Sequence, residues 1–216
     1  KDINSPLRDY NIRSYSMKKF LLKIISIFLI IVSGFCGYYG YLGYQIYQDK
    51  IEERSLSERV DQLKSNEDYV TLNQISPIYK EAVLKSEDRR FYQHGPVDYY
   101  GLARAMFTNL TTFSFKEGGS TITQQLAKNL CLSFEKDLSR KFAEVFIAKD
   151  LEDHYSKDEI LEMYLNITYL GEGNYGIQAA SQHYYHIDAI DLNKQQSEVL
   201  VKTLKRPSIY NPSKIN

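Results

Sequence analysis

Residues 86–109 read SEDRRFYQHGPVDYYGLARAMFTN. This stretch predicts the end of one helix, a turn and the start of a second helix. Gly95 and Pro96 break the run, and Asp98 opens a new apolar-periodic segment. An acid, a base and a cation at such a junction suit proton transfer beside an anion. The same charges also fit a solvated helix end with local ion pairs, and the stretch alone does not separate the two. The ionisable side chains at the end of the first predicted helix are Glu87, Asp88, Arg89, Arg90 and His94.

Length and composition indicate one globular domain with an appendage. The chain has 216 residues and a formal net charge of zero, so the whole molecule has no electrostatic bias toward nucleic acid, and we expect no nucleic-acid partner. The two cysteines, Cys36 and Cys131, are far apart, and Cys36 falls in an apolar run. We therefore expect neither a disulfide nor a cysteine metal site.

A single membrane-spanning helix is predicted near the N-terminus, at residues 20–44. Residues 24–42, IISIFLIIVSGFCGYYGYL, carry no charge, and about 20 residues cross the hydrocarbon layer of roughly 30 Å. A cleavable signal peptide and a buried core helix are the competing interpretations. Residues 1–19 are rich in Lys and Arg, which places them in the cytoplasm by the positive-inside rule. The remainder is then an extracytoplasmic domain anchored in the cytoplasmic membrane.

Beyond the anchor we predict a stalk at residues 45–75 and a mainly α-helical domain at residues 76–216. No segment shows sustained alternation of apolar and polar residues, which argues against strands. Helix starts are indicated by Ser76-Pro77, by capping boxes at Thr121/Gln124 and Ser156/Glu159, and by Asn193 with Gln196.

Three further segments carry specific expectations. A helix at about residues 138–155 is predicted to have its apolar face at Leu138, Phe142, Val145 and Phe146. Residues 169–176, YLGEGNYG, contain three glycines and predict a loop with unusual backbone angles. Residues 111–117 are predicted to be a loop with two exposed phenylalanines, ahead of a Gly-Gly hinge at 118–119.

Two sets of side chains are candidates for chemistry. Glu87 and Glu144 could supply the paired carboxyl groups that chemistry at a glycosidic centre commonly needs, although any two glutamates could be picked this way. A basic group on two successive helical segments could hold a di- or polyphosphate, and its alternative is ordinary helix-surface charge. This basic group consists of Lys128, Lys136, Arg140 and Lys141.

Five motifs follow one another in order over about residues 76–212. They are EDRRFYQH-x-x-x-D from Glu87, GGSTITQQLAKNL from Gly118, RKFAE from Arg140, EILEMYLNITYLGEGNYGIQAA from Glu159 and RPSIYNP from Arg206. Together they resemble the motifs of the peptidoglycan glycosyltransferases of glycosyltransferase family 51, and the second is nearly diagnostic alone. These proteins occur as monofunctional enzymes or as the N-terminal domain of class A penicillin-binding proteins.

The resemblance implies a lysozyme-like, mostly helical fold with a mobile apolar flap, matched by residues 107–117 with Phe107, Phe113 and Phe115. It implies that lipid II is polymerised into β-1,4-linked glycan by inverting displacement of undecaprenyl pyrophosphate. The implied partners are lipid II, the nascent glycan and the bilayer. Other cell-wall synthesis proteins stay open as partners.

The resemblance also assigns roles by position. Glu87 would act as general base, and Glu144 would position the donor pyrophosphate, alone or through a divalent cation, Mg²⁺ or Mn²⁺. The remaining matched positions imply substrate contacts or leaving-group stabilisation. They are Asp88, Phe91, His94, Ser120, Thr121, Gln124, Gln125, Lys128, Lys136, Arg140 and Lys141.

Two departures from the family pattern stand out. The family has H-x-G-x-D where this chain has H-G-P-V-D, so Pro96 takes the glycine position. Lys136 stands where many members have arginine, which keeps the charge but loses the bidentate fork.

Two alternatives to a glycosyltransferase stay open. A lysozyme-like hydrolase or lytic enzyme also uses a carboxylate in a helical fold, but it does not need pyrophosphate-binding cations. A non-catalytic membrane-anchored scaffold would tolerate the loss of either glutamate, and both are present. The chain starts with Lys and stops just after the fifth motif, so we expect it to be a fragment, and whether a transpeptidase domain follows is open.

Overall fold

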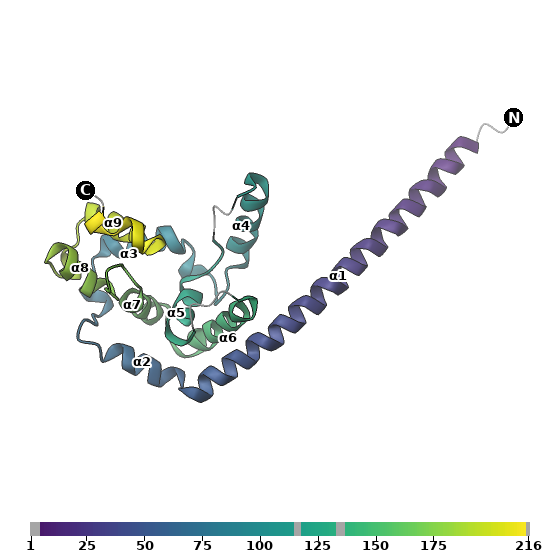
Figure 1. Ribbon diagram of the computed structural model, residues 1–216. Helices are drawn as coiled ribbons and strands as arrows, with labels where there is room; N and C mark the ends of the chain where they lie inside the picture. The colour runs from purple at the N-terminus through teal and green to yellow at the C-terminus, as the bar shows by residue number, and fades with distance from the viewer. Residues whose placement is uncertain (1–4, 115–117, 133–136, 215–216) are drawn as a thin grey trace.

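The computed structural model describes residues 5–114, 118–132 and 137–214, with side chains from Met17 onward. Figure 1 shows one long helix, α1, projecting away from a cluster of shorter helices. The described residues contain no strand, only an isolated antiparallel bridge between Tyr169 and Tyr175, so the prediction of a mainly α fold is confirmed. The helices are α1 (Ser5–Glu53), α2 (Leu56–Lys64), α3 (Pro77–Glu87), α4 (Tyr99–Thr112), α5 (Ile122–Cys131), α6 (Leu138–His154), α7 (Lys157–Ile167), α8 (Ile177–Tyr185), α9 (Lys194–Lys205) and α10 (Pro207–Tyr210).

Helix α1 contains the predicted apolar span and extends past it at both ends. The part from Met17 to Glu53 is long and apolar enough to cross a membrane, and its most apolar 18-residue window is not buried within the structure. The helix continues without interruption to Glu53, where it reaches the domain. The alternative of a buried core helix therefore does not describe this segment.

The segment expected to be a stalk, residues 45–75, packs partly into the domain. Leu56 and Val60 of α2 are buried in the same core as the later helices, and Ile51 of α1 lies against it. Asn166 of α7 donates to the carbonyl of Val70 and accepts from its N–H, both over 2.9 Å. Part of the packed domain therefore precedes residue 76.

Helix α5 lies at the centre of the domain and packs against both α6 and α7. Its residues Ile122, Leu126 and Ala127 are completely buried. Burying one leucine or isoleucine side chain contributes about 1.5–3 kcal/mol, so this helix fixes the positions of its neighbours. The second motif of the sequence is therefore also the core of the fold.

The predicted helix starts are confirmed. The capping boxes at Thr121/Gln124, Ser156/Glu159 and Asn193/Gln196 are all closed, and Pro77 occupies the first turn of α3. Each box satisfies two backbone N–H groups that would otherwise lack partners at the start of a helix.

The predicted glycine loop is also confirmed. Gly171, Gly173 and Gly176 all have positive φ, and Glu172 between them has φ 49°. At Gly176 a Cβ atom would lie 2.5 Å from the carbonyl oxygen of Asn166, so a side chain is excluded by space as well as by backbone angle. This close approach lets the loop fold back onto the end of α7.

Helix α4 exposes most of its apolar side chains. Only Gly101 and Ala105 are buried, and Phe113 at the C-terminal end is 97% exposed. The helix runs to Thr112, so the first two residues of the predicted loop at 111–117 are helical, and Phe115 lies outside the described residues. The exposed apolar residues of the segment are Tyr99, Tyr100, Leu102, Met106, Phe107, Leu110 and Phe113.

Candidate active site

Glu87 is the last residue of α3 and is held from two helices. Its Oε1 accepts a hydrogen bond from the Ser86 hydroxyl over 2.9 Å. Its Oε2 accepts from the side-chain Nε2 of Gln125, on α5, over 3.4 Å. The carboxylate is half-buried and lines a cleft, so it is oriented by the protein and still reachable by a ligand.

Glu144 lies on another wall of the same cleft, on α6, and is only 1% exposed. Its Oε2 is 2.5 Å from Nζ of Lys141, and its Oε1 is 3.5 Å from Nε of Arg140. Lys141 also donates to the Ser120 hydroxyl over 2.9 Å, which joins α6 to the start of α5. A carboxylate this deeply buried requires charge compensation, and these two cations supply it.

Lys128 of α5 completes the cationic group near Glu144. Burial lowers the pKa of its ammonium group, and the neighbouring Lys141 and Arg140 lower it further. The Glu144 carboxylate acts in the opposite direction and raises the pKa. The structure therefore brings three members of the predicted basic group, Lys128, Arg140 and Lys141, together beside Glu144.

The cleft has a volume of about 700 Å³ and is polar. Cationic side chains outnumber carboxylates around it, which suits an anionic ligand such as a pyrophosphate. Five of these cations were not among the predicted site residues, although Arg89 and Arg90 belong to the charged helix-to-turn junction predicted at residues 86–109. The additional lining cations are Lys85, Arg89, Arg90, Arg104 and Lys205.

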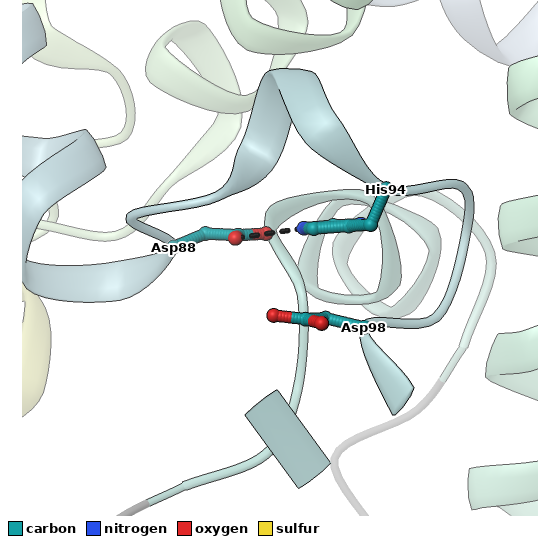
Figure 2. A group of neighbouring side chains, drawn as sticks. All are labelled: Asp88, His94 and Asp98. Atoms are coloured by element: carbon teal, nitrogen blue, oxygen red, sulfur yellow. Dashed lines mark hydrogen bonds and ion pairs between the residues drawn. The ribbon is translucent and has the colours of Figure 1, made fainter. Parts of the chain in front are cut away.

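Asp88, which follows Glu87 in the chain, converges with His94 and Asp98, and Figure 2 shows these three side chains. Asp88 Oδ1 lies 2.8 Å from Nε2 of His94, and Asp88 Oδ2 accepts from the backbone N–H of Ile122 over 3.1 Å. Asp98 Oδ1 lies 3.6 Å from a guanidinium nitrogen of Arg90. These contacts fix the turn after α3 to the first residue of α5.

The H-G-P-V-D departure is accommodated by this turn. Gly95 does not have a positive φ, and the carbonyl of Pro96 accepts from the Thr121 hydroxyl over 2.8 Å. Asp98 still immediately precedes α4. The altered turn is therefore tied to the same end of α5 that Asp88 contacts.

The predicted substrate-contact residues occupy different places. Ser120, Thr121 and Gln125 line the cleft together with Asp88, Lys128 and Lys141. The amide of Gln124 closes the capping box of α5, Phe91 is 1% exposed in the core, and His94 lines a second hollow beyond the turn. Lys136 lies outside the described residues.

The surroundings of Glu144 do not fit a divalent cation held by the protein. Its nearest charged neighbours are Lys141 and Arg140, and a hard cation needs several oxygen ligands. Within the described part of the chain, Asp88, His94 and Asp98 are the one group of three potential metal ligands, and Glu144 is not among them. There the Asp88 oxygens already bind His94 and Ile122.

Comparison with known proteins places these motifs in one family. Residues 53–216 match the family model described as Transglycosylase. The chain is 44% identical over 163 residues to penicillin-binding protein 1F of Bacillus subtilis (strain 168), covering 76% of this chain and 23% of that protein. It is 43% identical over 145 residues to penicillin-binding protein 1A of Neisseria lactamica and of Neisseria gonorrhoeae, covering 67% of this chain and 18% of each relative. The chain thus spans about a fifth of the length of these relatives.

Proposed function

The chain belongs to the transglycosylase family, and on that premise we propose that it is a peptidoglycan glycosyltransferase that polymerises lipid II. The observation that carries the proposal is the cleft itself. An oriented carboxylate, Glu87, and a buried Glu144 compensated by cations both line one polar cleft. An inverting transfer from a pyrophosphate needs a base for the acceptor and cations for the leaving group, and this cleft supplies both.

Glu87 is the proposed general base. It takes the proton from the 4-hydroxyl of the acceptor sugar as that oxygen attacks the anomeric carbon of the donor. The bond between that carbon and the pyrophosphate oxygen breaks, and undecaprenyl pyrophosphate leaves with the electron pair. Attack opposite an α-linked leaving group gives the β-1,4 product. The hydrogen bonds from Ser86 and Gln125 support this role, because they orient the carboxylate before substrate binds.

Lys128, Arg140 and Lys141 are the proposed stabilisers of the leaving group. Negative charge grows on the pyrophosphate as the glycosidic bond breaks, and fixed cations in a partly desolvated cleft stabilise that charge. Glu144 holds Lys141 and Arg140 in place, so its proposed role is to position the cations that contact the pyrophosphate. These cations also argue against a hydrolase, which has no pyrophosphate to bind.

The exposed apolar side chains of α4 and the apolar span of α1 support a reaction at a membrane surface. Contiguous exposed apolar residues mark a membrane or protein contact in a soluble domain. We therefore propose a single-pass topology, with the N-terminus in the cytoplasm and the cleft at the outer face of the cytoplasmic membrane. A substrate with an undecaprenyl tail would enter the cleft from the bilayer beside α4.

The test is to incubate the purified protein with labelled lipid II and to separate the products by size. We expect long glycan from the wild type and a loss of at least about 100-fold in Glu87→Gln, because a general base contributes 10²–10⁴-fold. Glu81→Gln, an exposed glutamate on the same helix, is the matched control and should keep full activity. Cleavage of preformed glycan without polymerisation would instead establish a hydrolase, and no turnover by a folded wild type would favour a scaffold.

A further inference from the structure

The strongest contact of the anchor helix α1 is with α6, the helix that carries Arg140, Lys141 and Glu144. Figure 1 shows the C-terminal part of α1 beside α6, whereas its N-terminal part projects away from the domain. Gly43 is buried at this contact, although the apolar span that precedes it is exposed. The anchor thus touches the domain directly behind the cationic wall of the cleft.

At Gly43 the two helix backbones approach so closely that there is no room for a side chain. An added Cβ atom would lie 2.5 Å from Phe142 Cβ, 2.8 Å from the backbone nitrogen of Ala143 and 2.8 Å from the carbonyl oxygen of Ser139. Two of these three atoms belong to the α6 backbone, so no side-chain rotation can relieve the clash. Any larger residue at this position must move α6 or detach α1.

Aromatic side chains extend the contact along both helices. Phe146 packs against Tyr44 and Tyr47, with ring centroids 5.5 and 6.1 Å apart. The Tyr47 hydroxyl donates to Oδ2 of Asp150 over 3.3 Å. About three turns of α6, from Ser139 to Asp150, therefore contact α1 along one face.

The residues of α6 that contact α1 are direct neighbours of Glu144, which lines the cleft, and of Arg140, which pairs with Glu144. Arg140 follows Ser139, and Glu144 follows Ala143, so a displacement at the Gly43 contact is passed directly to this pair. Glu144 is 1% exposed and Ala143 is completely buried, which leaves this part of the helix little freedom to adjust independently. Close-packed interiors transmit strain of this kind.

We propose that Gly43 is a positioning residue, through which the membrane anchor sets the place of Lys141 and Glu144 in the cleft and of Arg140 beside Glu144. This inference rests on the proposed function, because it concerns how the leaving-group end of that cleft is held. A misplacement of catalytic groups by about 1 Å can cost on the order of 100-fold in rate. The added methyl group of an alanine at position 43 is therefore large enough to lower the rate measurably. Gly43 itself does not touch substrate.

The chain offers a matched series of alanine substitutions. A Cβ would meet no heavy atom within 4 Å at Gly37, an ordinary contact of 3.9 Å at Gly40, and a clash at Gly43. All three lie in α1, and alanine is the better helix former at each, so helix propensity does not distinguish them. We expect Gly37→Ala and Gly40→Ala to polymerise lipid II as the wild type does. Gly43→Ala should lose at least about tenfold in kcat/KM, mainly in kcat, because the displaced groups act in the transition state.

Hydrogen exchange of the α6 amides, measured on the same full-length samples, tests the contact without turnover. We expect faster exchange over residues 139–148 in Gly43→Ala alone. If Gly43→Ala does not fold, Phe146→Leu serves instead, because it loosens the aromatic contact without overpacking and should lower kcat in the same way. If a folded Gly43→Ala or Phe146→Leu variant shows the same kinetics and the same hydrogen exchange as the wild type, the inference is overturned. An inactive wild type whose α6 exchange still responds to Gly43→Ala would refute the proposed function, and the catalytic part of this inference with it.

Discussion

The hydroxyl of Tyr164, on α7, donates to Oε1 of Gln125 over 3.2 Å. The side-chain amide of Gln125 accepts hydrogen bonds through Oε1 and donates them through Nε2. Because Tyr164 holds Oε1, the amide is oriented with Nε2 toward Glu87. Tyr164 is 1% exposed, and burial raises its pKa well above the usual value, with the Glu87 charge adding to the effect. The phenol therefore stays protonated and acts as a permanent donor.

Tyr164→Phe should lower kcat for lipid II polymerisation by about tenfold, because the Gln125 amide loses the bond that orients it. Gln125→Ala should lower kcat by at least as much. A double-mutant cycle checks whether the two residues act through one another. We expect the double variant to be no slower than Gln125→Ala, and fully additive losses would show that Tyr164 acts elsewhere.

The alkaline limb of the pH–activity profile should report on Lys128. Burial lowers its pKa, so as pH rises its ammonium is neutralised before that of an exposed lysine, and its stabilisation of the leaving group is lost. Lys128→Arg should move this limb to higher pH, since a guanidinium stays charged. Glu144→Gln should move it to lower pH, because the Glu144 charge raises the Lys128 pKa. Profiles of kcat/KM from about pH 7 to pH 10.5 make the measurement. If the alkaline limb stays at the same pH in both variants, Lys128 is not the group whose titration produces it.

Asp88→Ala should destabilise the domain by about 3 kcal/mol, because it removes a buried carboxylate that binds both His94 and the first N–H of α5. The expected fall in Tm is roughly 6–12 °C for a domain of this size. Asp153→Ala is the control, since Asp153 pairs with Lys149 on the surface and should shift Tm little. Equal shifts in the two variants would contradict the structural role of Asp88.

Cys131 should resist alkylation in the native protein. It is 5% exposed, and burial raises the pKa of its thiol to about 11. At pH 8 only about one thiol in a thousand would be the reactive thiolate. Mass spectrometry after iodoacetamide treatment should find Cys131 modified only after denaturation. Rapid native labelling at Cys131 would mean that α5 opens readily.

The helix starts could be predicted because their determinants are local. The capping boxes at Thr121 and Ser156 each involve residues three apart, and the structure closes both. The partner of the apolar face of α6 could not be predicted, because it is not local. The spacing of Phe142 and Phe146 predicted an apolar face, and that face contacts α1, whereas Ile147 and Leu151 are buried in the core. Periodicity shows that a face is apolar and does not identify its partner.

The cleft could be predicted only in part. Glu87 and Glu144 were found because they fall in ordered motifs, and the structure brings both to one cleft. Lys205 also reaches this cleft, from the end of α9, more than 60 positions beyond Glu144 in the chain. No spacing rule connects such distant residues, because tertiary packing alone brings them together.

Helix α1 continues into the domain without a break, and this limits which insertions and deletions α1 can accept. A continuous helix carries rotation as well as position, and each residue adds about 100° of turn and about 1.5 Å of rise. One residue inserted between Leu42 and Gly43 would leave the contacts of Gly43, Tyr44 and Tyr47 with α6 in register, and would rotate the preceding apolar span by about 100° relative to the domain. With the proposed membrane topology, an exchange of one exposed apolar residue of α1 for another should be tolerated, whereas an insertion or deletion should change the direction in which the cleft faces.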